Sequence, residues 1–81
     1  MNLRYTANAS KAFADALARV QRAFLKQAAL LQTNLQHPSL HAKKFDESGD
    51  VWQARVNRAW RFYFLIEADN YIITNIIPHP K

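Results

Sequence analysis

The stretch DVWQARVNRAWRFYFLIE, residues 50–67, decides the fold prediction because apolar side chains recur in it at every second position. This alternation places successive side chains on opposite sides of a strand. We therefore predict two strands joined by a hairpin around 57–59. A slip of one residue would set apolar side chains opposite polar ones, so the pattern also predicts the register. The expected core-side pairs are Val56 with Trp60, Ala54 with Phe62 and Trp52 with Phe64.

The same register places Arg55 directly opposite Arg61. Cross-strand neighbours lie about 4.5–5.5 Å apart at Cβ, and like charges at that distance destabilise a sheet. A nearby acid such as Glu67 or Asp46 would remove the cost by pairing with one arginine. Because two arginines face each other in a basic chain, we favour the interpretation that an anion binds between them.

Composition limits the possible classes of protein. The chain has 81 residues, 49% of them hydrophobic, with no cysteine and a net charge of +5. We expect one domain, 1–81, with a modest core and no disulfide or thiolate site. No segment approaches the ~20 apolar residues of a membrane span, so we expect a soluble cytoplasmic protein. The charge favours a polyanion or an acidic protein as partner.

The segment before Pro38 carries a helical pattern. Apolar residues recur there at spacings of three and four, which places them on one helical face. Asn8 or Ser10 is the expected N-cap. Periodicity leaves open one long helix or two helices with a bend near 17–20. The residues of the apolar face are Phe13, Leu17, Val20, Phe24, Ala28, Leu31 and Leu35.

Strands are predicted at both ends of the chain. The segment NLRYT, residues 2–6, is a short strand, and YIITNII, residues 71–77, follows an expected turn at Asp69-Asn70. The fold class is therefore α+β, with helices packed on a meander of three or four antiparallel strands.

Sites for a metal or a nucleophile have little support. His37 and His41 are spaced like a helical metal-binding pair, but Pro38 interrupts the helix and no cysteine is available as a further ligand. The sequence contains no phosphate-binding loop and no serine-nucleophile motif. We predict no metal and no cofactor. Histidine is the side-chain type best suited to proton transfer near neutral pH, and His79 is the candidate for that role.

Four features follow one another in a characteristic order. They are the pair Lys43-Lys44 after HPSL, Trp52 at the head of a strand, ARVN followed by Trp60-Arg61, and a final strand that leads to His79. In order and spacing the chain resembles the RelE/ParE superfamily of toxins from bacterial type II toxin–antitoxin systems. The resemblance covers nearly the whole sequence.

The resemblance implies a short first strand, a helical hairpin and a twisted antiparallel sheet. Ribonuclease members cleave messenger RNA in the ribosomal A site without a metal, and the 2′-hydroxyl attacks to leave a cyclic phosphate. By this resemblance Arg61, Arg55 and His79 are catalytic. Contacts to RNA are expected from Lys43, Lys44, Gln53, Arg58 and Tyr63.

Departures from the family pattern keep a second function open. The carboxylate that some members use as a base has no clear counterpart, Glu47 being the nearest in sequence. Ribonuclease members commonly carry a tyrosine or a further basic residue close to the C-terminus, where this sequence stops at Lys81 just after His79. The alternatives are a ParE-like inhibitor of DNA gyrase without nuclease activity, and a basic binding domain that has lost activity. The expected partners are a cognate, acidic antitoxin that wraps the helices and sheet, and either the ribosome with messenger RNA or DNA gyrase. No membrane partner is expected.

Overall fold

The computed structural model describes residues 1–46 and 48–79. No helix in this described part is long and apolar enough to cross a membrane. In chain order the elements are β1 (Asn2–Tyr5), α1 (Ala7–Asp15), α2 (Ala18–Thr33), the 3-10 turn η1 (Pro38–Leu40), β2 (Lys43–Asp46), β3 (Val51–Arg55), β4 (Trp60–Glu67) and β5 (Asn70–Pro78).

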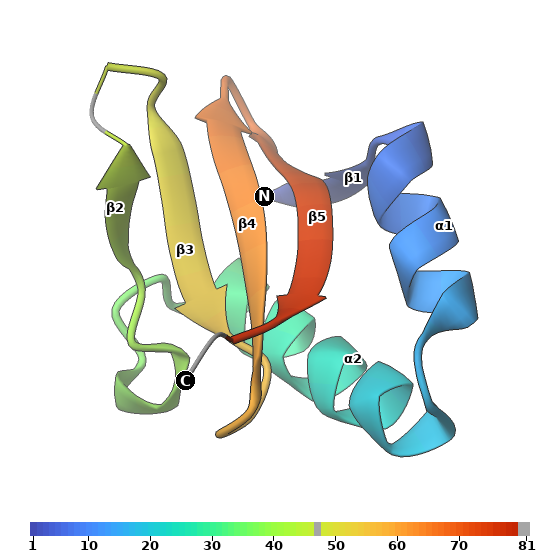
Figure 1. The fold of residues 1–81 in the computed structure, drawn as a ribbon. Coiled ribbons are helices and arrows are strands. Elements are labelled where there is room, and N and C mark those ends of the chain that lie inside the picture. The colour runs from blue at the N-terminus through green and yellow to red at the C-terminus, as the bar shows by residue number, and fades with distance from the viewer. Residues whose placement is uncertain (47, 80–81) are drawn as a thin grey trace.

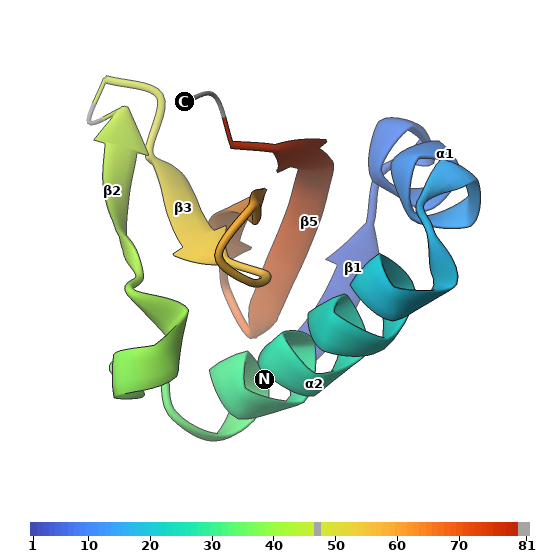
Figure 2. The same ribbon diagram turned by 60° about the horizontal axis from the view of Figure 1, so that its bottom comes forward.

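The strands form one five-stranded sheet in the order β1-β5-β4-β3-β2. Strand β1 runs parallel to β5, and every other neighbouring pair is antiparallel. Helix α2 crosses behind the sheet, and α1 lies beside β1 and β5 (Figures 1 and 2). The α+β prediction is confirmed. The sheet is larger than the predicted meander because β1 pairs with the last strand and adds a parallel edge.

The hairpin of β3 and β4 has the predicted register. Ala54 pairs with Phe62 and Trp52 pairs with Phe64, while Arg55 stands opposite Arg61. Side chains alternate between the two sides of a strand, so the apolar pairs face the helices and the arginines face away from them. The position of the charged pair thus follows from burial of its apolar neighbours.

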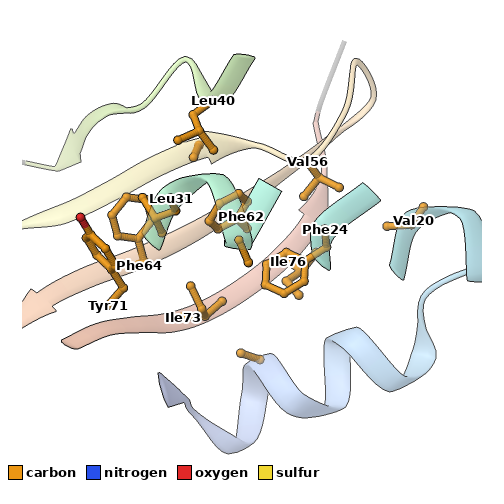
Figure 3. Close-up of a cluster of buried hydrophobic side chains, with 13 residues drawn as sticks. Val20, Phe24, Leu31, Leu40, Val56, Phe62, Phe64, Tyr71, Ile73 and Ile76 are labelled. Carbon is orange, nitrogen blue, oxygen red and sulfur yellow. The ribbon is translucent and has the colours of Figure 1, made fainter. Parts of the chain in front are cut away.

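The core lies between the helices and the sheet (Figure 3). Phe24 from α2 meets Phe62 edge to face, with ring centroids 5.2 Å apart. Of the predicted helical face, Val20, Phe24, Ala28 and Leu31 are buried. Leu17 departs from the pattern with 56% of its surface exposed, because it is the N-cap residue of α2.

The helical segment is divided into two helices, which separate at Ala16 and Leu17. The first helix begins earlier than the predicted caps. Its N-cap is Thr6, whose side-chain oxygen accepts the N–H of Ala9 at 3.1 Å. Asn8 lies inside α1, where its amide donates to the carbonyl of Thr74 in β5 at 2.9 Å. The side chain of Asn8 therefore connects α1 to the sheet instead of capping the helix.

The loop between β4 and β5 is shifted by one residue from the prediction. Asn70 already pairs with Glu67, so the two loop residues are Ala68 and Asp69. Ala68 adopts a left-handed conformation with φ of 52°. Strand β5 begins at this position because Asn70 pairs with Asn2 of the neighbouring strand β1. Local turn preferences cannot predict this contact, because the two residues are far apart in the sequence.

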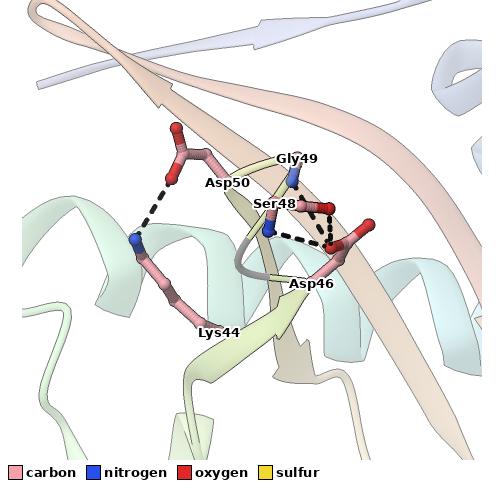
Figure 4. A network of polar contacts seen from close by, with 5 residues as sticks. All are labelled: Lys44, Asp46, Ser48, Gly49 and Asp50. Carbon is pink, nitrogen blue, oxygen red and sulfur yellow. Dashed lines mark hydrogen bonds and ion pairs between the residues drawn. The ribbon is translucent and has the colours of Figure 1, made fainter.

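The connection after β2 is organised by the carboxylate of Asp46 (Figure 4). One Asp46 oxygen accepts the N–H of Ser48 at 3.1 Å, its hydroxyl at 2.8 Å and the N–H of Gly49 at 3.4 Å. The Ser48 hydroxyl is the main cause, and Gly49 the next, of a pKa of Asp46 below its ordinary value. The turn is thus built around an ionised carboxylate.

Substitution Asp46→Ala should lower the thermal midpoint at neutral pH. The pKa of Asp46 is lower in the folded than in the unfolded chain, so its stabilising effect is present above the ordinary value of about 4 and disappears as the pH falls through the folded pKa. Thermal unfolding at pH 7 and at pH 2 should show the difference from wild type shrinking in acid. Asp15→Ala, which removes an exposed carboxylate on α1, is the control. A difference that does not depend on pH would contradict this account.

Candidate functional site

The side of the sheet that faces away from the core carries a pocket of about 460 Å³. Residues far apart in the sequence line it, coming from the end of η1, from β2, β3 and β4, and from just beyond β5. We call it the arginine pocket, and its lining residues are His41, Ala42, Lys43, Gln53, Arg55, Arg61 and His79. Each predicted catalytic residue is therefore in one pocket.

Neither arginine of the facing pair has an acidic partner in residues 1–46 and 48–79. The ion pairs in that part of the chain are Lys11 with Asp15 and Lys44 with Asp50. The proposed neutralising acids Glu67 and Asp46 are absent from both pairs. Like charges thus face each other across the strands without compensation from the described residues, which is the arrangement that favours an anion.

Arg55 carries an unsatisfied donor. Its Nε is buried and has no hydrogen-bond partner among the described residues. Most buried polar atoms in proteins are paired, so an orphan of this kind calls for a specific explanation. A bound anion would supply the acceptor that the chain itself does not.

Arg61 is anchored on one side and available on the other. Its Nη1 donates to the carbonyls of Asn57 at 2.8 Å and Trp60 at 3.0 Å, which closes the hairpin loop. Burial, followed by the nearby charge of Arg55, lowers the pKa of Arg61, although a guanidinium still keeps its proton at neutral pH. The N–H groups on Nε and Nη2 remain available to a ligand, and the bonds that Nη1 makes hold the guanidinium in place.

His79 reaches the pocket through a backbone bond. Its N–H donates to the carbonyl of Ala59 at 2.7 Å, which joins the residue after β5 to the loop between β3 and β4. The ring of His79 is exposed and lines the same pocket as Arg55 and Arg61. The end of the last strand and the arginine hairpin are therefore held together by main-chain contact.

The predicted RNA contacts divide into two groups. Lys43 and Gln53 pair in register and both line the pocket. Lys44 stands opposite Trp52, so it points to the other side of the sheet, where its Nζ meets Asp50 at 3.1 Å (Figure 4). Arg58 is exposed in the hairpin loop and does not line the pocket. Alternation along β2 separates the two lysines.

Tyr63 lies beside the pocket together with an aromatic residue that the sequence reading missed. The Tyr63 hydroxyl accepts the side-chain N–H of Gln53 at 2.9 Å, and its ring meets Phe45 edge to face at 5.1 Å. Phe45 is 59% exposed, an unusual exposure for a large aromatic ring. The signal that would have found it is its position two residues after Lys43, on the same side of the strand.

His41 was also missed, because the sequence suggested it only as half of a rejected metal pair. The described residues contain no group of three side chains suited to hold a metal ion. His37 instead accepts the N–H of Ser39 through Nδ1, and His41 lines the pocket of the arginines. The base suggested at Glu47 lies outside the described residues.

Comparison of the whole chain with known proteins gives matches in structure alone. No protein-family model and no curated protein sequence matches the chain. The YoeB/ParE toxin from Agrobacterium tumefaciens superposes with a TM-score of 0.82 over 99% of this chain and 100% of that chain, at 12% identity. The chain has the RelE/ParE toxin fold. The resemblance stated from the sequence is confirmed at the level of the fold.

Other proteins with this fold superpose nearly as well. The archaeal RelE–RelB complex from Pyrococcus horikoshii gives a TM-score of 0.78 at 17% identity, over 95% of this chain and 92% of that chain. The toxin–antitoxin complex RelBE2 from Mycobacterium tuberculosis gives 0.78 at 17% identity, over 96% of each chain. The RelE/ParE fold is therefore shared along nearly the whole described chain.

On the helical side of this RelE/ParE-like fold lies a second hollow, which is apolar. It has a volume of about 300 Å³ and is lined by Tyr5, Ser10, Phe13 and Leu25. Tyr5 is 41% exposed and Leu25 is 53% exposed. We call this the helical groove. It shares no lining residue with the arginine pocket.

Gln27 of α2 connects the core to the arginine pocket. It is 6% exposed, and its Nε2 donates to the carbonyls of Ser39 at 3.0 Å and Arg55 at 2.9 Å. One amide thus holds the segment that leads to His41 and the end of the strand that carries Arg55. The pocket depends on a polar contact that comes from the opposite side of the sheet.

The variant Gln27→Leu should lower the free energy of unfolding by about 1–3 kcal/mol, because both carbonyls lose their donor while the volume stays similar. Urea denaturation followed by tryptophan fluorescence measures the loss. Gln32→Leu is the control, since the amide of Gln32 on the same helix also donates to a carbonyl, that of Met1 at 2.8 Å, but at an exposed site where water replaces the lost donor. Equal stabilities of the Gln27→Leu and Gln32→Leu proteins would contradict the role given to Gln27.

Proposed function

We propose that this protein is the toxin of a type II toxin–antitoxin system and acts as a metal-free, ribosome-dependent endonuclease on messenger RNA. The observation that carries the proposal is the pair Arg55 and Arg61, which face each other without an acidic partner among the described residues. The RelE/ParE fold supports the toxin class. The chemistry of the pocket supports a phosphodiester as its ligand.

Cleavage of RNA without a metal places specific demands on the pocket. Attack of the 2′-hydroxyl on phosphorus increases negative charge on the non-bridging oxygens. Guanidinium groups meet those oxygens with two parallel N–H bonds and keep their protons throughout the reaction. Arg55 and Arg61 fit this role because they stand opposite each other in the hairpin, and the bonds made by Nη1 of Arg61 fix that side chain before substrate binds.

The remaining polar groups of the pocket fit supporting roles. Lys43 supplies an ammonium that attracts the RNA backbone, and Gln53 supplies an amide beside it. His79 supplies an imidazole, the side chain that most often serves as a general acid or base. Tyr63 and the exposed Phe45 offer aromatic surface for a base next to the cleaved phosphate. We assign Lys44 and Arg58 only peripheral contacts with the RNA or the ribosome, because neither lines the pocket.

The helical groove supports the second part of the proposal, an antitoxin partner. Structures with the same fold include a RelE–RelB complex and a complex named as toxin–antitoxin. The exposed Tyr5 and Leu25, with the half-buried Phe13, suit an apolar segment of such a partner, and the net charge of +5 suits an acidic one. The antitoxin would protect the cell by covering this surface or the arginine pocket.

Primer extension on a messenger RNA in a purified bacterial translation system tests the nuclease proposal. Discrete cuts that appear with ribosomes and are absent without them are the expected result. A supercoiling assay with purified DNA gyrase is run in parallel on the same protein. Inhibition of supercoiling without any cut RNA would reject the nuclease and select the ParE-like alternative.

A further inference from the structure

The arginine pocket contains two histidines. His41 follows η1 and His79 follows β5, yet both line the pocket with Arg55 and Arg61. Both residues are exposed, and neither ring makes a hydrogen bond to another described residue. The pocket therefore brings together two imidazoles that are available to a ligand and two guanidinium groups.

We propose that His41 is a catalytic residue of this pocket and exchanges a proton with the RNA substrate as the partner of His79. The inference rests on the proposed nuclease function. One imidazole takes the proton of the 2′-hydroxyl as that oxygen bonds to phosphorus. The other, as imidazolium, gives a proton to the 5′-oxygen as the phosphorus–oxygen bond breaks. The products are a 2′,3′-cyclic phosphate and a 5′-hydroxyl, and water restores both protonation states.

Elimination among the lining residues supports this assignment. Lys43, Arg55 and Arg61 supply an ammonium and two guanidinium groups, which stabilise negative charge, and an amide such as that of Gln53 does not exchange protons as an acid or a base. No acidic side chain is among the described lining residues. Histidine is the side chain whose two protonation states are both populated near pH 7. Among the lining residues, the reaction therefore has both a base and an acid only if one histidine acts as the base and the other as the acid.

The backbone at His41 is held in an uncommon conformation. Its φ is 46°, in the left-handed region, and its N–H closes η1 by donating to the carbonyl of Pro38 at 3.3 Å. Residues with side chains enter this region at a cost, which the surrounding structure must offset, and such positions gather at functional sites. The fully buried Leu40 and the contact of Gln27 with the carbonyl of Ser39 hold this segment in place.

His37 provides a matched comparison within the same segment. Its Nδ1 accepts the N–H of Ser39 at 3.2 Å and lies 3.0 Å from the Ser39 hydroxyl, so this ring has a structural role as N-cap of η1. It does not line the arginine pocket. The substitution His37→Asn keeps a capping acceptor while removing an imidazole. Loss of activity through general damage to η1 would affect both histidine variants.

The first test is the pH dependence of single-turnover cleavage on ribosomes for wild type, His41→Ala, His79→Ala and His37→Asn. The charged groups that face His41 are Lys43 from β2, Arg55 from β3, Arg61 from β4 and His79, so ionic strength is held constant. We expect His41→Ala to cut on the order of 10²-fold more slowly and to lose one limb of a bell-shaped profile. His37→Asn should stay within about threefold of wild type. Unchanged rate and unchanged limbs in His41→Ala would overturn the inference while leaving the nuclease proposal intact.

The second test does not depend on activity. Inorganic phosphate is added to the wild-type protein while the Cε1–H signals of the histidines are followed by NMR. Signals of His41 and His79 should shift together, and that of His37 should stay in place. Phosphate that moves His79 but not His41 would overturn the inference. Shifts of both signals in a protein that cuts no RNA would reject the nuclease function and the catalytic role together, leaving an anion site.

Discussion

Replacement of Arg55 by methionine is expected to slow ribosome-dependent cleavage about 10²–10³-fold, which is the usual loss when one preorganised donor to a developing oxyanion is removed. The same substitution should leave the protein at least as stable as wild type. Arg55 faces the like charge of Arg61, and its Nε is buried without a partner in the described chain. Methionine keeps an unbranched stem of similar length and removes both costs.

Gain of stability together with loss of activity would identify Arg55 as a functional residue, because residues kept for activity are often unfavourable for folding. Primer extension gives the rate, and thermal unfolding gives the stability. Arg22→Met is the matched control, since Arg22 is an exposed arginine of α2 and its loss removes the same charge. If Arg55→Met is less stable than wild type and loses activity only in proportion to its unfolded fraction, Arg55 has a structural role instead.

Substitution Phe24→Ala should lower the free energy of unfolding by about 3–5 kcal/mol. Phe24 has no exposed surface, and its ring makes edge contacts with Tyr5, Phe13 and Phe62. It therefore joins β1, α1, α2 and β4 at one point. Proteins of this length are stable by roughly 4–12 kcal/mol, so the variant should lose a large fraction of the total stability.

Urea denaturation measures this loss, with Leu25→Ala as the control at the next position of the same helix. Leu25 is 53% exposed, so its truncation should change the free energy of unfolding by no more than about 0.5 kcal/mol. Comparable losses in Phe24→Ala and Leu25→Ala would contradict the location of the core between α2 and the sheet.

The hairpin of β3 and β4 was predictable because the alternation of apolar and polar residues specifies both strands and their register. Side chains alternate along a strand, and burial of Ala54 and Phe62 forces Arg55 opposite Arg61. The predicted helical face was also correct at Val20 and Phe24, because helical periodicity depends only on spacing. Local repetition was sufficient for these features.

Element ends were predicted less well, because tertiary contacts determine them. Thr6 caps α1 in place of Asn8, whose amide binds the carbonyl of Thr74 across the fold. Asn70 belongs to β5 because β1 pairs with it from the other side. Neither contact involves residues near in sequence, so local preferences for caps and turns could not reveal them.

The sequence by itself determined the α+β class, the paired arginines and the resemblance to the RelE/ParE toxins, because alternation, helical spacing and motif order are properties of the linear chain. Only the tertiary structure brought His41 to the pocket of Arg55, Arg61 and His79, and turned Lys44 away from it. The physical reason is that these placements depend on contacts between distant segments. The amide of Gln27 holds the carbonyls of Ser39 and Arg55, and the N–H of His79 reaches the hairpin loop.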